Sequence, residues 1–529
     1  MTKTNNADLF NLSQFVIGNQ AKKHPNATAL KVISQNLKKT SPQVSKKHNW
    51  QTTLWTYQEL DQAIRSIANG LIKEGLKKGD FLPLRLKSDT TYALTFFGAI
   101  AAGIIPIPLS PQLTSSEVDF FLDDTGAKHI ALSENLPLSE HAVSSSTIIR
   151  ETDILSFIEG HPPLDYATTH QDNPAFLIYS SGTTNKPKGV LHAQRVVKGR
   201  LPMQDGWHQI EQSDNVLHAG DFNWTYTLGV GLMDPWIWGA TALIYSPQEG
   251  EEKAPELWPE LIKDHEITIF AAVPGIYRKI LKYANPTPED LQTLRHGLTA
   301  GEALHRDLKT NWETKTNIPL YEALGQSEIS TYASTSLNIN CPPEAKGRIQ
   351  SGRKIKILKE GTIKETQIEC APNEEGLIAV HNSDPGLMLQ YWNRPAEMKE
   401  AFSGEWFITG DRGSIDENNH LTHLGRADDV MNAQGVRVSP LEVETCLLQH
   451  PSISEAAVFE KRISSDLSII SALLVLNADY SDEDNTSKEL TELMKNELAS
   501  YKHPKSIKFV AHLPRNNAGK LLRNKLQNL

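Results

Sequence analysis

The sequence predicts an α/β protein with a large, multi-layer N-terminal domain of β-sheets and helices and a small α+β C-terminal domain. The chain has 529 residues, which is too long for one hydrophobic core. Short apolar runs alternate with segments of helical spacing, and this favours stacked α/β layers over a helical bundle or an all-β fold. After about residue 350 the runs shorten, and a smaller unit begins near Asp428.

The clearest helix begins after Thr56. Thr56 is its predicted N-cap, and Glu59, three residues later, completes a capping box. Apolar residues keep helical spacing at Leu60, Ile64, Ile67 and Leu71. Glycines then close this unit before a strand at residues 81–86.

A charge-free segment at residues 90–116 invites the interpretation of a membrane span. Such a span would contain two glycines and two prolines, at Gly98, Gly103, Pro106 and Pro108. We therefore predict a buried helix at 92–102, a turn at Gly103 and a short core strand.

The remaining elements follow from apolar runs between polar or glycine-containing segments. In the large domain, residues 11–35 predict a helix and then a strand at 29–33, and further strands are expected at 130–132, 175–179, 240–245, 267–273, 354–358 and 376–381. In the small domain we expect helices at 440–449 and 488–498, strands at 456–459 and 469–476, and an acidic linker at 479–486. The basic stretch at 38–47 is predicted to be a solvated loop.

Composition narrows the classes of function. Hydrophobic residues make up 39% of the chain and charged residues 22%, as in ordinary globular proteins. The net charge of -10 argues against a general nucleic-acid binder. The first ten residues show no basic region followed by an apolar core, so we expect no secretory signal. Cys341, Cys370 and Cys446 have no metal or disulfide spacing, which favours the reducing cytoplasm.

One loop carries the chemistry of phosphate binding. A predicted strand at 174–179 leads into Ser180, Ser181, Gly182, Thr183 and Thr184. Backbone N–H groups of such a loop can turn toward one anion, while the hydroxyls donate hydrogen bonds and Lys188 adds positive charge. The order Lys188-Gly189 is not a Walker A motif. An ordinary polar loop is the alternative, but the uninterrupted block behind a strand favours a nucleotide phosphate.

The block from Tyr179 to Val190 resembles the phosphate-loop signature of the adenylate-forming superfamily, which includes acyl-CoA synthetases, peptide-synthetase adenylation domains and luciferases. Five further blocks follow in the family's order between residues 299 and 523. Asn185 is a departure, since the family usually has glycine there. Asn tolerates left-handed backbone angles, so the loop shape can be retained.

Residues 299–304 resemble the family's adenine-pocket segment. The resemblance implies that Gly301 and Glu302 border the base and that Ala300 faces the acyl group. Without it, a simple turn would explain Gly301 and Glu302.

Residues 321–328 resemble the family's Tyr-Gly-Gln-Thr-Glu motif. The resemblance implies that Glu322 lies beside adenine, that Gln326 contacts the nucleotide and that the Ser327 hydroxyl binds the α-phosphate. Glu328 corresponds to the carboxylate that holds Mg²⁺, a hard cation that shares oxygen ligands with phosphates. A surface carboxylate is the alternative for Glu328.

Residues 406–413 and 425–444 match two more family signatures. They imply that Asp411 accepts hydrogen bonds from the ribose hydroxyls and that Arg426 contacts ribose and phosphate. They also imply that Gly435 lets pantetheine pass close to the backbone, with Arg437 nearby. A solvated aspartate in a turn is the alternative for Asp411.

Residues 514–523 resemble the C-terminal signature, with Arg515 and Asn516 in place of Lys and Thr. Lys520 fits the lysine of the adenylation step, although a lone lysine near a C-terminus is more often solvated. Lys520 and Gly435 cannot face one site at once in this family. The resemblance therefore implies a large domain at 1–427, a small mobile domain at 428–529 and a hinge at Asp428.

The acyl pocket is predicted from Trp224, Ala300 and Gly325. Trp224 resembles an aromatic wall residue of acetate-type and medium-chain synthetases, although a core aromatic is the alternative. Gly325 stands where strict acetate enzymes carry a blocking tryptophan, which implies a roomier pocket. The run at 438–444 looks most like medium-chain and benzoate-type ligases, so we expect a medium-sized aliphatic or aromatic acid.

The resemblance implies an ATP-dependent, AMP-forming carboxylic acid:CoA ligase that works through an acyl-AMP intermediate. Lys520, Lys188 and Glu328 are the expected catalytic residues, with ATP, Mg²⁺ and coenzyme A as cofactors. The expected partners are a small carboxylic acid and CoA, without nucleic acid or an integral membrane span, and a homodimer stays open. The alternatives are an adenylation enzyme that loads a carrier-protein phosphopantetheine, a luciferase-like oxygenase and a non-catalytic nucleotide-binding regulator.

Overall fold

The structure, a computed structural model, describes residues 9–35, 50–180, 187–247, 253–339, 341–342, 345–361, 366–429, 431–433, 436–463, 468–477, 480–515 and 521–529. The predicted phosphate-loop residues Ser181, Gly182, Thr183 and Thr184 lie outside these ranges, as do Asn185, Gly435 and Lys520. The basic stretch at 38–47 also lies outside them.

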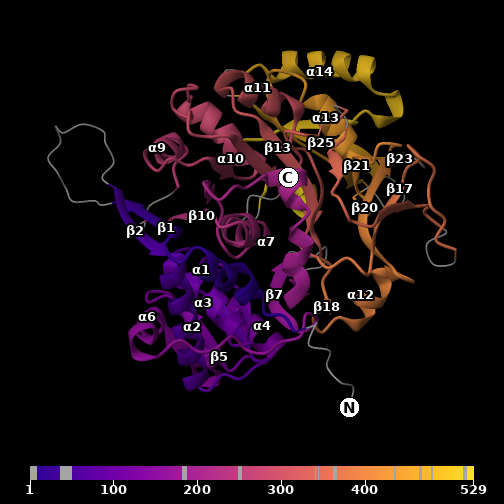
Figure 1. The fold of residues 1–529 in the computed structure, drawn as a ribbon. Helices are drawn as coiled ribbons and strands as arrows, with labels where there is room; N and C mark the ends of the chain where they lie inside the picture. Colours follow the sequence, from indigo (N-terminus) through magenta and orange to yellow (C-terminus); the bar gives the residue numbers. More distant parts are fainter. Residues whose placement is uncertain are drawn as a thin grey trace.

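A 14-stranded mixed sheet runs through the large domain (Figure 1). Its parallel part consists of β13 (Leu320–Gln326), β12 (His296–Ala300), β11 (Ile269–Ala271), β9 (Asn215–His218), β10 (Thr241–Tyr245) and β1 (Thr28–Gln35). Antiparallel β2 (Trp50–Thr56) adds one edge. Beyond β13 the sheet continues antiparallel through β14 (Ser330–Ser334), β15 (Gly347–Ile349), β21 (His420–Arg426), β20 (Trp406–Ile415), β17 (Gly376–His381) and β16 (Ile355–Leu358), with β19 (Phe402–Ser403) beside β20.

Two apolar cores cover the two faces of the parallel part. On one face, Trp258, Tyr277 and Trp312 pack around Phe270. They come from the helices α9 (Leu257–Asp264), α10 (Pro274–Lys279) and α11 (Arg306–Thr316). The other face carries a core of buried residues that includes Ile269, next to Phe270 in the chain. Successive side chains of a strand point to opposite faces, which explains the division.

A four-stranded parallel sheet forms a second layer system near the N-terminus. It contains β4 (Ile105–Pro108), β3 (Phe81–Arg85), β5 (His129–Leu132) and β6 (Thr147–Arg150). The associated helices are α1 (Asn19–Lys23), α2 (Tyr57–Lys73), α3 (Thr90–Ala101), α4 (Ser115–Thr125), α5 (Glu140–Ser145) and α6 (Glu151–Gly160). The alternation of strands and helices in this part of the sequence is confirmed.

The two most specific helix predictions are confirmed. The Thr56 side chain accepts from the Glu59 N–H, and the Glu59 carboxylate accepts from the Thr56 N–H, so the capping box is formed. The charge-free segment forms α3, whose residues from Thr91 to Ala101 are buried. Among the described residues, every helix is too short or too polar to span a bilayer.

A three-stranded antiparallel sheet borders the predicted phosphate loop. It consists of β7 (Pro174–Ser180), β8 (Lys188–Ala193) and β18 (Gln390–Tyr391). The strand predicted at 175–179 is thus part of a hairpin whose connection is the loop itself. The short helix α12 (Pro395–Glu400) follows β18.

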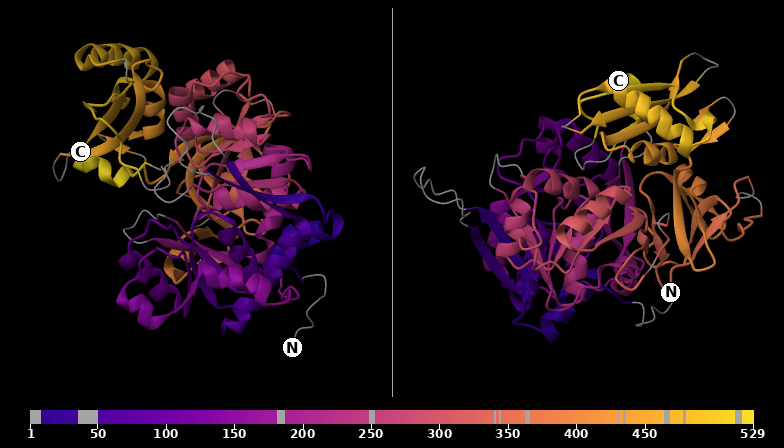
Figure 2. Two further views of the ribbon diagram at one scale, coloured as in Figure 1. Left: turned by 90° about the vertical axis from the view of Figure 1, so that its left-hand side faces the viewer. Right: turned by 90° about the horizontal axis from the view of Figure 1, so that it is seen from above.

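The small C-terminal domain forms a separate unit at one side of the large domain, most clearly in Figure 2. Its three-stranded sheet contains β24 (Ile453–Arg462), β25 (Ser468–Leu476) and β26 (Ser506–Phe509). The domain also has a separate two-stranded sheet of β22 (Met431–Ala433) and β23 (Val436–Val438), and the helices α13 (Pro440–Leu447) and α14 (Glu483–Glu497). Met431 packs in one core with Val443, Val458 and Leu490.

The prediction of an acidic linker at 479–486 is wrong in its second half. Helix α14 begins at Glu483, five residues before the predicted helix start. Asp482 is its N-cap and accepts a hydrogen bond from the Asn485 N–H. Acidic residues favour the first turn of a helix, so this run of carboxylates marks a helix start.

Candidate active site

The predicted phosphate loop begins and ends at a pair of facing residues. Ser180 at the end of β7 lies opposite Lys188 at the start of β8, and its Oγ donates to the Lys188 carbonyl at 3.4 Å. The Lys188 Nζ atom lies 2.7 Å from Glu397 Oε2 and 4.6 Å from the centre of the Tyr391 ring. The hydrogen bond from Lys188 lowers the pKa of Glu397. Lys188 is therefore held as a half-buried cation at the mouth of the loop.

Tyr391 connects Lys188 to Glu328. The Tyr391 hydroxyl donates to Glu328 Oε1 at 2.8 Å. Burial raises the pKa of Tyr391, and the Glu328 carboxylate raises it further, so the hydroxyl stays a donor. The structure thus brings two predicted catalytic residues to one tyrosine between them.

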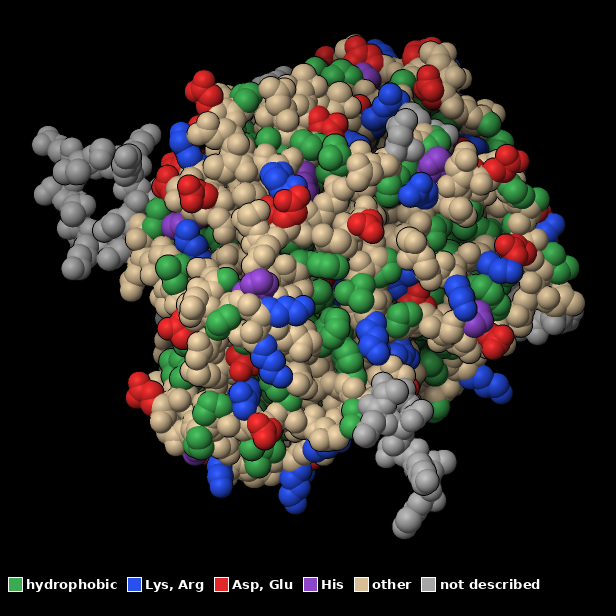
Figure 3. All heavy atoms as spheres, in the orientation of Figure 1, with side chains coloured by type: hydrophobic (Ala, Val, Ile, Leu, Met, Phe, Trp, Pro, Cys, Tyr) green, Lys and Arg blue, Asp and Glu red, His purple; other side chains and the backbone are tan. Residues whose placement is uncertain are grey.

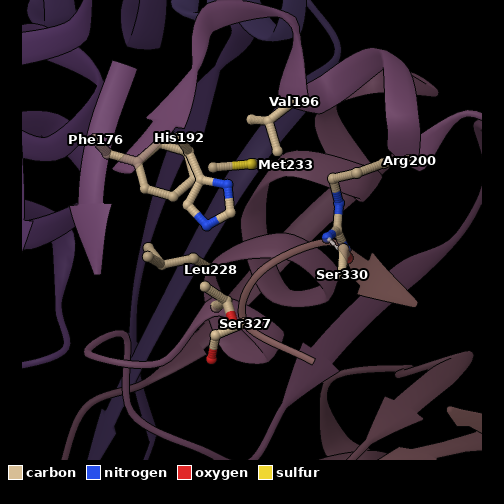
Figure 4. A pocket seen from close by; sticks show the side chains of 9 residues that line it. Phe176, His192, Val196, Arg200, Leu228, Met233, Ser327 and Ser330 are labelled. Carbon is tan, nitrogen blue, oxygen red and sulfur yellow. Dashed lines mark hydrogen bonds between the residues drawn. The ribbon is translucent and has the colours of Figure 1, made fainter. Parts of the chain in front are cut away.

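A small cavity, about 20 Å³ in volume, lies beside Ser327 (Figure 4). Phe176 and His192 stack in its wall, with ring centres 4.8 Å apart, and the apolar residues Leu228 and Met233 complete that side. Burial lowers the pKa of His192 to about 3, so its imidazole is neutral. Ser327 thus lines a small cavity whose other walls are partly apolar and partly polar, the latter including Arg200 and Ser330.

Asp411 and Arg426 form a pair across two neighbouring strands. They are register partners on β20 and β21, and Arg426 Nη1 lies 3.5 Å from Asp411 Oδ1. Gln326 donates from Nε2 to Asp411 Oδ2 at 3.0 Å. Burial works against the charge of Asp411, but His423, Arg426 and Gln326 together hold its pKa below the usual value. Asp411 is thus an ionised carboxylate in a buried position.

Arg426 also reaches the predicted hinge. Its Nε donates to Asp428 Oδ1 at 3.1 Å, and its Nη1 donates to the Thr409 carbonyl at 2.9 Å. Burial opposes its charge, but Asp411, Asp428 and then Glu328 raise its pKa. Arg426 therefore stays cationic and lies close to the predicted ribose, metal and hinge residues at once.

Glu322 forms an ion pair with a residue that no motif indicates. Lys346 Nζ lies 3.1 Å from Glu322 Oε1, and the Leu304 N–H donates to the same oxygen at 2.9 Å. This places the predicted adenine residue Glu322 next to the end of the other adenine segment. The two blocks meet at this carboxylate through Leu304 and Glu322, which are 18 residues apart in sequence.

Gly301 lies under the ring of Trp224. Gly301 has φ +88°, and a Cβ atom on it would lie 2.6 Å from Trp224 Cη2. Both the backbone angle and the ring require glycine here. Ala300 precedes it in β12, and Ala300, Ala323 and Trp224 belong to one apolar cluster. Small side chains thus face a half-buried tryptophan where the acyl pocket was predicted.

Gly325 has a packing reason of its own. A Cβ atom on Gly325 would lie 2.1 Å from the Ser330 carbonyl oxygen and 2.5 Å from Thr331 Cα. The β13–β14 register shifts at this point, which brings the two backbones together. Its role as a pocket wall stays a prediction.

Glu302 contacts the small domain. Arg515 Nη1 lies 3.0 Å from Glu302 Oε1, and Arg515 Nη2 lies 2.6 Å from Glu455 Oε2. Burial raises the pKa of Glu302 above its usual value, and the attraction of Arg515 and Arg278 offsets only part of this rise. Arg437 lies in β23, and Gly435 and Lys520 lie outside the described residues.

Five residues whose contacts no motif indicates touch the predicted site residues: Tyr391, Glu397, Lys346, His423 and Arg515, the last through Glu302. Each of them contacts a predicted site residue from another strand, helix or loop of the chain. Among the described residues, no group of three or more His, Cys, Asp or Glu side chains could hold a metal ion.

Comparison with known proteins identifies the family. The model of the AMP-binding enzyme matches residues 17–392, and the model of the AMP-binding enzyme C-terminal domain matches residues 442–520. The benzoate–CoA ligase of Thauera aromatica is 28% identical over 493 residues, or 89% of this chain and 90% of the relative. The mitochondrial acyl-coenzyme A synthetase ACSM5 of Mus musculus is 30% identical over 501 residues, or 90% of this chain and 84% of the relative.

Solved structures agree in fold. A benzoate CoA ligase from Burkholderia xenovorans LB400 superimposes with a TM-score of 0.84 at 25% identity and covers 98% of this chain and 100% of the other. The anthranilate CoA ligase AuaEII in complex with anthranoyl-AMP has a TM-score of 0.86 at 24% identity, with 98% and 97% covered. Both family models match, and the first alone covers more than half of the chain, so the chain belongs to the AMP-binding enzyme family.

Proposed function

We propose that the protein is an AMP-forming carboxylic acid:CoA ligase that activates a medium-sized aliphatic or aromatic acid through an acyl-AMP intermediate. The observation that carries the proposal is the convergence of Lys188, Glu328, Asp411 and Arg426, drawn from four sequence blocks, around one site. The similarity to acyl-CoA and benzoate–CoA ligases over most of the chain supports it.

The nucleotide would bind along this row of residues. Ser180, Lys188 and the loop between them would take the phosphates of ATP, and Ser327 would donate to the α-phosphate. Asp411 would accept hydrogen bonds from the ribose hydroxyls, with Arg426 beside ribose and phosphate. Glu322, Gly301 and Glu302 would border adenine, with Gln326 as a further contact.

Glu328 fits a Mg²⁺ ion in one respect that the structure supplies. Its carboxylate accepts a hydrogen bond from the Tyr391 hydroxyl, which orients it. Mg²⁺ commonly binds one or two carboxylates and takes its other ligands from phosphates and water. When bound, the ion would neutralise phosphate charge.

The reaction would take two steps. A carboxylate oxygen of the acid attacks the α-phosphorus of ATP, forming acyl-AMP and releasing pyrophosphate. The thiolate of CoA then attacks the acyl carbon and releases AMP. Because an anion attacks a polyanion in the first step, Lys188 and Lys520 would act by neutralising charge at the α-phosphate. No acid–base triad is required.

The small domain would alternate between the steps. We propose that it begins at Asp428, with 1–427 as the large domain. Arg426 ends β21 of the large sheet, whereas Met431 packs in the core of the small domain, which supports a hinge between them. Lys520 would serve adenylation, and Gly435 with Arg437 would serve the thioester step.

The class of acid that is activated is also part of the proposal. The apolar cluster of Ala300, Ala323 and Trp224 supports an apolar acyl group, with Gly325 as a proposed neighbour. Benzoate and anthranilate in the names of similar proteins favour the aromatic class.

Three free cysteines support the proposed cytoplasmic location.

A carboxylate panel tests the function. The protein is incubated with ATP, Mg²⁺, CoA and single aliphatic or aromatic acids, and AMP, pyrophosphate and thioester are measured. We expect AMP release that requires both an acid and CoA. Acyl-AMP without transfer to CoA, but with transfer to a carrier phosphopantetheine, would identify the carrier-loading alternative. No AMP with any acid would contradict the ligase assignment.

A further inference from the structure

Arg515 joins the two domains through an ionic bridge. It binds Glu302 of the large domain at 3.0 Å and Glu455 on β24 of the small domain at 2.6 Å. The exposed fractions of the three side chains are 32%, 20% and 27%, so water screens the bridge only in part. Arg515 is thus bound at two points that belong to different domains.

The bridge is part of a balanced cluster of charges. Arg278 on α10 lies within electrostatic reach of Arg515, Glu302 and Glu455. Two guanidinium groups thus face two carboxylates. Removing Arg515 would leave two half-buried carboxylates opposite a single cation.

Arg515 also stands at the base of a hairpin. Arg515 and Leu521 form an antiparallel bridge, and the Leu522 N–H donates to the Pro514 carbonyl at 2.8 Å. Lys520 is joined directly to Leu521 by a peptide bond. Because consecutive Cα atoms are about 3.8 Å apart, the position of Leu521 in this stem restricts where Lys520 can lie.

We propose that Arg515 is a positioning residue for acyl-AMP formation, which holds the stem of the Lys520 segment against Glu302 at the rim of the nucleotide site. The inference rests on the proposed function. Arg515 acts through Lys520 and contacts no reacting atom. When the small domain turns for the thioester step, the contact with Glu302 must break, whereas the contact with Glu455 stays within one domain.

The kinetic test compares Arg515→Met with Arg515→Lys and a matched control, Lys502→Met. Lys502 forms an ion pair with Glu442, and both belong to the small domain. We expect Arg515→Met to slow acyl-AMP formation about tenfold, as for a half-buried ionic network, while thioester formation from supplied acyl-AMP stays within about twofold. Arg515→Lys should restore part of the loss, and Lys502→Met should alter neither half-reaction.

A double substitution tests the contact itself. If Arg515 acts through Glu302, adding Glu302→Gln to Arg515→Met should slow acyl-AMP formation less than the two single effects combined. Full additivity would overturn the proposal. Equal loss in both half-reactions, or no loss in either, would also overturn it.

Hydrogen exchange of the intact protein gives a readout that does not need activity. The backbone amides at 300–310 should exchange faster in Arg515→Met than in the unaltered chain, and Lys502→Met should leave them unchanged. Unchanged exchange in Arg515→Met would contradict the proposal that Arg515 holds the two domains together. If no acid gives acyl-AMP, the proposed function fails, and the exchange result still decides whether Arg515 ties the domains.

Discussion

Asp411 and Arg426 face each other across β20 and β21, with Arg426 Nη1 3.5 Å from Asp411 Oδ1. Asp411 is almost completely buried, whereas 42% of the Arg426 side chain is exposed. The pair therefore presents a fixed carboxylate and a reachable guanidinium at the last strand before the small domain. This arrangement suits a nucleotide-binding site that is in direct contact with the proposed hinge residue Asp428.

Asp411→Asn should weaken ATP binding and lower stability in a pH-dependent way. The folded-state pKa of Asp411 is depressed, so its stabilising contribution is present above the unfolded value of about 3.9 and is lost as the pH falls through the folded value. We expect a loss of about 1–3 kcal/mol at pH 7. Calorimetric unfolding at pH 7 and at a series of pH values below about 3.9 should show the difference shrinking as the pH falls; a difference independent of pH would contradict it.

Lys520→Ala should impair one half-reaction. Removing a preorganised cation or donor costs about 3–4 kcal/mol, so acyl-AMP formation should fall about 100- to 1000-fold. Thioester formation from supplied acyl-AMP should stay close to that of the unaltered protein. Gly435→Leu should show the opposite pattern. Equal loss in both half-reactions for Lys520→Ala would contradict the two-orientation account.

Tyr391→Phe should weaken activation by Mg²⁺. The substitution removes the hydroxyl that orients Glu328, and loss of such a supporting hydrogen bond typically costs about 10–100-fold in metal affinity. The Mg²⁺ dependence of acyl-AMP formation measures this. Tyr179→Phe is the matched control, because the Tyr179 hydroxyl donates to Asp124 instead. An identical effect in both variants would remove Tyr391 from the metal site.

Gly325→Ala should destabilise the large domain. Its Cβ would lie 2.1 Å from the Ser330 carbonyl oxygen, so the β13–β14 hairpin must shift, at about 1–3 kcal/mol. Gly275→Ala is the control, since nothing lies within 4 Å of its added Cβ in α10. We expect the melting temperature of Gly325→Ala to fall clearly below that of Gly275→Ala. An unchanged melting temperature for Gly325→Ala would contradict the close backbone approach.

Local signals in the sequence predicted much of the fold. The capping box at Thr56, the buried helix predicted at 92–102 and the strand that leads into the phosphate loop all depend on residues close in sequence. The start of α14 was misplaced because a run of carboxylates can mark either a solvated linker or a first helical turn. The position of β10 between β9 and β1 depends on pairing with a strand more than 200 residues away in sequence, about 206 residues from Gln35 to Thr241, which no local pattern encodes.

The sequence indicates candidate site residues only where several of them lie in one motif block. Glu328, Asp411 and Arg426 were found by motif, and the structure places them near one another. Lys346 and Tyr391 were missed because each contributes a single side chain from an unremarkable segment. Contacts between distant segments need the folded chain, and so does the packing reason for Gly325.

The most direct test of the central claim follows the oxygen atoms of the acid. A carboxylic acid labelled with ¹⁸O in both carboxyl oxygens is converted with ATP and CoA, and the products are weighed by mass spectrometry. Attack on the α-phosphorus predicts one ¹⁸O atom in each AMP and none in pyrophosphate. Label in pyrophosphate or phosphate, or AMP without label, would contradict the account.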